Sequence, residues 1–178
     1  PTYVRQIVKI EMGARSDTEP SESPALTPYL SDAFSEQLGE TAFHIKTVAA
    51  RRTFWDKAML LHEETFRPAD KPRKRPLARH YYDLWSLIQK GIAAEALADG
   101  GLFDRVAAHR QMFFTYRWMD YTTLKPGSLR LLPHPDQLST WRGDYSAMRT
   151  EMFFGDVPAF DEILRVVGEF EKTFNASA

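Results

Sequence analysis

The chain has 178 residues, a formal net charge of -1, 43% hydrophobic residues and no cysteine. A chain of this size can bury roughly 70% of its extended surface in a compact domain, and its near-neutral charge indicates that any site for an anion is local. The lack of cysteine excludes disulfides, a thiol nucleophile and thiolate metal sites, and it favours a cytoplasmic protein. No apolar segment reaches the roughly 20 residues that span a bilayer, so we expect no membrane partner.

The first fifty residues predict two strands separated by a loop. Residues Tyr3 to Met12 alternate between apolar and polar side chains, which is typical of a strand. The stretch 13–28 is rich in serine, proline and acids and predicts an irregular loop. Residues Ala42 to Ala49 predict a second, short strand. Because the chain begins at Pro1 and enters the first strand at once, we expect it to be a fragment of a longer polypeptide.

The rest of the chain predicts helices. The first should start at Thr53, with Asp56 in a capping-box position, and end at Phe66 before Pro68. Four more amphipathic segments follow, and Tyr116 should point inward from the second of them. They cover Leu77–Ala98, Leu102–Met119, Asp136–Phe153 and Phe160–Phe174. The pattern therefore predicts an α+β fold, with residues 1–50 forming strands and residues 51–178 forming a helical domain of about five helices.

Lys57 and Asp83 lie on the first two predicted helices. A short loop joins these helices, so we expect a helical hairpin that brings the two side chains together. A lysine at an enclosed cleft can hold phosphate oxygens, and a neighbouring carboxylate can orient it or accept a proton from an attacking hydroxyl. A salt bridge on a solvated helix face remains the alternative interpretation.

Two further groups of charged residues are candidates for binding. Lys9 and Glu11 share one face of the first strand, where the carboxylate could ligate Mg²⁺, although charged pairs on edge strands also serve solubility. A basic loop could contact the backbone of a nucleic acid, or it could simply be solvated. It contains Lys71, Arg73, Lys74 and Arg75.

Histidines offer a weaker hypothesis, that of a metal hydrolase. His62 and Glu63 begin an HExxH-like pattern, but Phe66 stands where the second histidine would be required. The other four histidines are scattered over different predicted elements: His44, His80, His109 and His134. A zinc site assembled from them would be detected as bound metal after purification.

Three segments together resemble the AbiEii/AbiGii-type nucleotidyltransferase toxins. The resemblance rests on Val8-Lys9-Ile10-Glu11, on Thr53 to Leu61 with its Asp56-Lys57 pair, and on Arg79-His80-Tyr81-Tyr82-Asp83-Leu84. A later segment, Asp144 to Met148 followed by Met152-Phe153-Phe154-Gly155 and Pro158, is similar to the C-terminal helical region of that family. The resemblance covers most of the chain.

The resemblance implies a function and roles for residues. The fold would be a short remnant of a nucleotidyltransferase-type sheet followed by the helical bundle. The intact protein would use Mg²⁺ to transfer a nucleotide from an NTP to an acceptor, an RNA such as tRNA, as the toxin of a toxin-antitoxin or phage-defence system with a cognate antitoxin. Lys57 and Asp83 would be catalytic. Lys9, Lys57 and Arg79 would bind the nucleotide, and Glu11 would ligate the metal.

One departure from the family pattern is large. Such proteins carry a Gly-Gly or Gly-Ser turn near the N-terminus with an Asp-x-Asp pair, and this chain has no such turn in its first fifty residues and no Asp-x-Asp pair at any position. We therefore expect that this half precedes Pro1 and that the fragment alone is inactive. His80 stands where many relatives have an acid, so its role is open. The competing hypothesis is a non-catalytic helical interaction module that binds an antitoxin or another partner, which a long exposed apolar stripe would favour.

Overall fold

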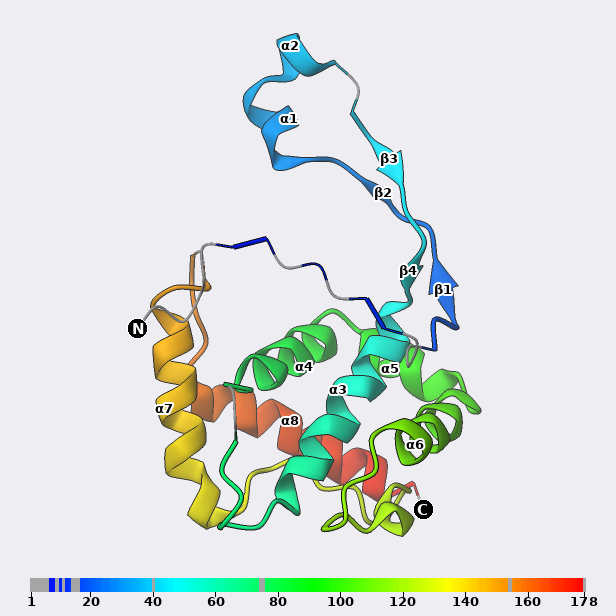
Figure 1. Cartoon of the computed structure of the whole chain (residues 1–178), viewed down its shortest axis with the longest axis vertical. Coiled ribbons are helices and arrows are strands. Elements are labelled where there is room, and N and C mark those ends of the chain that lie inside the picture. The colour runs from blue at the N-terminus through cyan, green and yellow to red at the C-terminus, as the bar shows by residue number, and fades with distance from the viewer. Residues whose placement is uncertain are drawn as a thin grey trace.

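The computed structural model describes residues 7, 8, 10, 12, 13, 17–39, 41–73, 76–153 and 155–177. Figure 1 shows two parts, a helical body and a narrow arm that projects from it. The fold is α+β, as the sequence predicts, with eight α-helices and two small two-stranded sheets in the described part. Within that part no helix is both long and apolar enough to cross a membrane.

The arm, residues 17–39 and 41–48, is an antiparallel ribbon. Its strands are β1 (Ser21–Glu22), β2 (Ala25–Leu26), β3 (Phe43–His44) and β4 (Thr47–Val48). Strand β1 pairs with β4, with Ser21 opposite Val48, and β2 pairs with β3, with Ala25 opposite His44. Two short helices, α1 (Tyr29–Ala33) and α2 (Ser35–Leu38), lie between β2 and β3 at the far end of the arm (Figure 1).

The arm corrects the predictions for the first fifty residues. The stretch 13–28, predicted as an irregular loop, contains β1 and β2, because its backbone pairs with residues more than fifteen positions away. The strand predicted for Ala42–Ala49 is present as two short strands. Most of the strand predicted for Tyr3–Met12 lies outside the described residues. Its described members are not in a strand, and their side chains are 64–95% exposed: Ile7, Val8, Ile10 and Met12.

The helical body is formed by six helices. Helix α3 (Ala50–Thr65) packs against α4 (Arg79–Gln89), α5 (Ile92–Ala98) and α6 (Leu102–Phe113), and α8 (Phe160–Asn175) packs against α4. Helix α7 (Leu138–Arg149) follows a 3₁₀ turn at Pro135–Gln137, and another 3₁₀ turn spans Tyr121–Thr123. Figure 1 shows α8 passing behind α3 and running below α4.

Aromatic side chains fill the core of the body. Trp55 of α3 contacts Phe103 of α6 edge-on, with ring centroids 4.9 Å apart, and Phe54 contacts Phe170 of α8 in the same way. Tyr81 of α4 and Trp141 of α7 form a third such pair. These large side chains are almost completely buried, so they fix how α3, α4 and α8 pack and thereby position the polar residues on their outer faces.

Several predicted helix boundaries require correction. The predicted helix Leu77–Ala98 is two helices, because Gly91 adopts φ 79° and ends α4. The predicted helix Leu102–Met119 stops at Phe113, so Tyr116 lies beyond it and is 36% exposed rather than inward. The helix at Asp136–Phe153 is shorter at both ends than predicted, whereas Phe160–Phe174 is confirmed almost to the residue.

Helix α3 begins at Ala50, three residues before the predicted start. Its cap residue Ala49 has no side chain that can accept a hydrogen bond, and the Ala49 N–H donates to the carbonyl oxygen of Pro20 in the arm instead. Asp56 is therefore not part of a capping box. Its carboxylate lies 3.6 Å from the guanidinium of Arg52, one helical turn earlier.

Candidate functional site

Lys57 of α3 and Asp83 of α4 form a direct ion pair. The Nζ atom of Lys57 donates a hydrogen bond of 2.6 Å to Oδ2 of Asp83. The two side chains are 21% and 35% exposed, so both remain accessible to a ligand. The contact that the sequence predicts between the two helices is therefore present, while the catalytic role of the pair remains a prediction.

Of the other predicted site residues, one is exposed near the ion pair, one is buried, and two lie outside the described part of the chain. Arg79 is exposed on α4 one helical turn before Asp83, so the two lie on the same side of the helix. His80 is buried, with 8% exposure, and belongs to the packing of α4 rather than to its solvent face. Lys9 and Glu11 lie outside the described residues, so whether a sheet brings them to Lys57 stays a prediction.

The start of α4 is held by a distant carboxylate. Oδ2 of Asp144, on α7, accepts hydrogen bonds from the backbone N–H groups of Leu77 and Ala78 at 2.7 and 2.8 Å. These donors precede the first turn of α4 and have no partner within the helix. Asp144 therefore fixes the position of the helix that carries Asp83, and local sequence patterns could not reveal it because the residues are 66 and 67 positions apart.

Charged residues also gather where the arm joins the body. Arg52, only 1% exposed, donates to Oδ2 of Asp17 at 2.7 Å and to the carbonyl oxygen of Glu19 at 2.5 Å. A hydrogen bond from the Glu19 N–H, helped by Arg52, lowers the pKa of Asp17, and burial raises the pKa of Asp56. A cavity of about 240 Å³ lies beside them. This cluster links the arm to α3, and sequence analysis missed it.

Two acids in the second half of α3 are each paired with an arginine through both carboxylate oxygens. Glu63 accepts from Arg110 of α6 at 2.7 and 2.6 Å, with both side chains buried. Glu64 accepts from Arg67 at 2.7 and 2.6 Å. Burial raises the pKa of Glu63, which the hydrogen bonds from Arg110 oppose. These bidentate pairs neutralise both acids.

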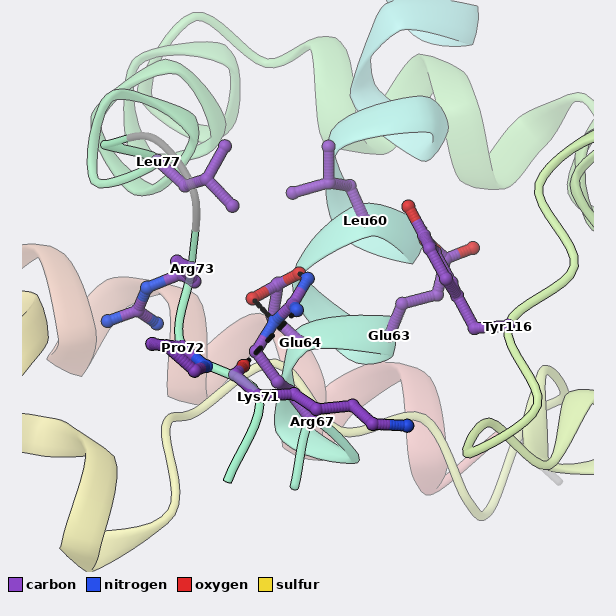
Figure 2. A pocket seen from close by; sticks show the side chains of 9 residues that line it. All are labelled: Leu60, Glu63, Glu64, Arg67, Lys71, Pro72, Arg73, Leu77 and Tyr116. Atoms are coloured by element: carbon purple, nitrogen blue, oxygen red, sulfur yellow. Dashed lines mark hydrogen bonds and ion pairs between the residues drawn. The ribbon is translucent and has the colours of Figure 1, made fainter. Parts of the chain in front are cut away.

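A hollow of about 690 Å³, which we call the basic cleft, opens beside these acids (Figure 2). Its walls come from α3, from the segment between α3 and α4, and from the segment after α6. The lining residues are Leu60, Glu63, Glu64, Arg67, Lys71, Pro72, Arg73, Leu77 and Tyr116. Lys71 and Arg73 belong to the predicted basic loop, whose Lys74 and Arg75 lie outside the described residues.

His62 has a structural role. It is fully buried, its Nδ1 accepts a hydrogen bond from the Arg130 N–H at 2.9 Å, and its Nε2 lies 2.9 Å from Oγ1 of Thr123. Burial lowers its pKa to about 4, so the ring is neutral near pH 7. The described residues contain no group of three or more histidine, aspartate and glutamate side chains placed to hold a metal ion.

Comparisons with known proteins give one match. The family model described as "Nucleotidyl transferase AbiEii toxin, Type IV TA system" matches residues 1–166 of the chain. No curated protein and no solved structure matches. The matched range includes the ion pair of Lys57 with Asp83, the basic cleft and the arm.

Proposed function

The chain belongs to the family of nucleotidyl transferase AbiEii toxins of type IV toxin-antitoxin systems, and from this premise we propose that the protein transfers a nucleotide from an NTP to an RNA acceptor such as tRNA. The observation that carries the proposal is the accessible ion pair of Lys57 with Asp83. Growth inhibition would follow from blocking the RNA end in the cytoplasm. The antitoxin that the family description implies would counter this effect.

Lys57 is suited to hold the phosphates of the NTP. A lysine ammonium has three N–H donors, and the hydrogen bond to Asp83 uses one of them. Two donors remain for phosphate oxygens, where a fixed positive charge stabilises the negative charge that develops during transfer. Arg79, exposed on the same side of α4 as Asp83, can add a second cation for the nucleotide.

Asp83 is suited to act on the acceptor hydroxyl. Its Oδ2 accepts from Lys57, and among the described residues no donor reaches its Oδ1. That oxygen can accept the proton as the hydroxyl attacks the α-phosphorus, where the new oxygen–phosphorus bond forms and pyrophosphate leaves. Its second role is to orient Lys57, because the ion pair holds the ammonium of α3 beside the carboxylate of α4.

Nucleotidyltransferases generally use a divalent metal, and we propose Mg²⁺ for this protein. The residues described do not by themselves make its site, since Asp83 is the carboxylate beside Lys57 and is already engaged with it. Glu11, the candidate ligand from the sequence, lies outside the described residues. We propose further that residues 1–50 belong with the nucleotidyltransferase core and residues 51–178 form its helical partner.

Growth assays test the proposal. Induced expression of the protein at its full natural length should arrest growth, and Lys57→Ala or Asp83→Ala should each relieve the arrest. Lys90→Ala serves as the matched control, because Lys90 is an exposed cation at the end of α4 that makes no ion pair in the described part of the chain. Full toxicity in both site variants would exclude the assigned roles.

The arm favours a second candidate function, a non-catalytic interaction module. Large apolar side chains that are 37–94% exposed follow its length, as such a module requires. They are Leu26, Tyr29, Leu30, Phe34, Leu38, Phe43, Ile45 and Val48. The growth assay separates the two functions, since a module would stay toxic without Lys57 or Asp83 and would lose toxicity when Tyr29 and Phe34 are replaced by serine.

A further inference from the structure

The basic cleft contains two cations, Lys71 and Arg73, that form no ion pair with any described residue. Its two acids, Glu63 and Glu64, already use both carboxylate oxygens for Arg110 and Arg67. Among the residues that the structure describes, no carboxylate lies within ion-pairing distance of Lys71 or Arg73. The cleft therefore has two positive charges available to a ligand.

Arg73 is held in a specific position although no acid of the described part of the chain forms an ion pair with it. Its guanidinium lies 3.7 Å from the centre of the Trp141 ring. The side chain is half-buried, and burial lowers its pKa because the cation loses water, a loss that the charges of Glu64 and Asp144 offset only in part. An anionic ligand in the cleft would compensate that loss.

The cleft also has an aromatic wall. Tyr116 lines it and is 36% exposed, and its ring stacks on Trp118 with centroids 4.6 Å apart and planes inclined by 13°. Figure 2 shows Tyr116 on the side of the cleft opposite Arg73. Exposed aromatic rings beside cations are typical of proteins that bind single-stranded nucleic acid, because a base stacks on the ring while the cations contact the phosphates.

The space is larger than one phosphate group needs. A second hollow of about 260 Å³ shares Arg67, Lys71, Pro72 and Arg73 with the first and extends to Asp136, Gln137 and Thr140. The two hollows lie along the same basic segment and could accommodate a chain of several linked phosphates. This favours an extended polyanion over a free phosphate ion.

The cleft is connected to the catalytic pair through α3. Lys57, Leu60 and Glu64 follow one another at intervals of three and four residues, so they share one face of the helix. Leu60 and Glu64 line the cleft, and Glu64 lies about 10 Å along the helix axis from Lys57. An acceptor strand that lies in the cleft can thus place its end at Lys57.

We infer that the basic cleft binds the phosphate backbone of the single-stranded end of the acceptor RNA, with Lys71 and Arg73 on the phosphates and Tyr116 stacked against a base. The reacting hydroxyl of that strand lies at Lys57 and Asp83. This inference rests on the proposed function and adds to it a binding site for the acceptor.

Binding of a fluorescently labelled single-stranded RNA oligonucleotide to the protein at full natural length tests the inference. The double variant Lys71→Ala/Arg73→Ala should bind about tenfold more weakly at 0.1 M salt. The slope of log K against log salt concentration should fall by about 1.4, since each phosphate contact to a single strand contributes about 0.7. Tyr116→Ala should weaken binding about fivefold or more, and Tyr116→Phe should not.

The double variant Lys90→Ala/Lys172→Ala is the matched control. It removes two exposed lysines that line neither hollow and make no ion pair in the described part of the chain, so RNA binding should stay within about twofold of the wild type. An equal loss of RNA affinity in both double variants would contradict the inference. A second contradicting result would be that inorganic pyrophosphate abolishes RNA binding while Lys71→Ala/Arg73→Ala leaves RNA binding unchanged.

The inference and the proposed function fail in different ways. If Lys71→Ala/Arg73→Ala binds RNA like the wild type while Lys57→Ala is non-toxic, the cleft is not the acceptor site and the transfer function stands. If Lys57→Ala and Asp83→Ala remain fully toxic, the proposed function fails. In active protein the cleft variants should raise KM for RNA and leave KM for the NTP unchanged.

Discussion

Lys57 and Glu64 lie on the same face of α3, two helical turns apart, and each forms an ion pair with a residue outside that helix. Lys57 contacts Asp83 of α4, and Glu64 contacts Arg67 just after α3. Helix α3 therefore carries both the lysine of the proposed catalytic pair and a wall of the basic cleft. The stability of the surrounding helices should determine how well the two sites keep their spacing.

The first prediction concerns the buried pair of Glu63 with Arg110. Arg110→Ala leaves the carboxylate of Glu63 buried without its partner, and we expect the free energy of unfolding to fall by about 3–5 kcal/mol. Urea denaturation measures this loss. The double variant Glu63→Ala/Arg110→Ala should lose less than the sum of the single variants, and additive losses would contradict the proposed coupling.

The second prediction concerns pH and His62. Folding lowers the pKa of His62 to about 4 from 6.5, so the unfolded chain binds the proton more readily. The stabilisation by neutral His62 is present above pH 6.5 and is lost as the pH falls toward 4. Between pH 7 and pH 5 we expect the wild type to lose about 2 kcal/mol from this residue. Urea denaturation at both pH values should show that the free energy of unfolding falls less between pH 7 and pH 5 in His62→Gln than in the wild type. An equal fall in both proteins would contradict this role of His62.

The third prediction concerns the turn between α4 and α5. Gly91 has φ 79°, which strains any residue with a side chain, while a Cβ atom there would meet no other atom within 4 Å. Gly91→Ala should therefore destabilise the protein by about 1 kcal/mol through the backbone alone. Gly100→Ala is the matched control, because Gly100 has equal space and no positive φ. Thermal unfolding should show a lower Tm for Gly91→Ala than for Gly100→Ala; the reverse order would contradict the account.

Sequence patterns predicted the elements that depend on near neighbours. Helix α8 has a regular apolar face and a proline before its start, and its bounds were predictable. The break at Gly91 was missed because a single glycine is also tolerated within a helix. Strands β1 and β2 of the arm were missed because each has two residues and pairs with a distant partner, as Ser21 does with Val48.

The same distinction applies to the candidate site. The contact between Lys57 and Asp83 was predictable, because both residues lie on strongly periodic helices joined by one loop. The hydrogen bond from the Leu77 N–H to Asp144 was not predictable, because only the tertiary fold brings α7 to the start of α4. Lys71 and Arg73 of the basic cleft are recognisable in the sequence as part of a basic loop. Tyr116, which forms the aromatic wall of the cleft, is not, because the sequence predicts it on the inward face of a helix that in fact ends at Phe113.

The fourth prediction separates the chemistry of the Lys57–Asp83 pair from its contribution to stability. Because both side chains are partly exposed, breaking the pair should cost at most about 1 kcal/mol of the free energy of unfolding. Asp83→Asn preserves the shape of the side chain and removes its capacity to accept a proton at neutral pH. Thermal unfolding should give a Tm close to that of the wild type, and a large drop would show that the pair is mainly structural.

Transfer of radiolabelled nucleotide from an α-labelled NTP to RNA tests the central claim most directly. With the protein at full natural length and Mg²⁺ present, Lys57→Ala and Asp83→Asn should each reduce transfer about 100-fold or more, and Lys90→Ala should transfer like the wild type. Wild-type rates of transfer in Lys57→Ala and Asp83→Asn would contradict the claim that this pair performs the reaction.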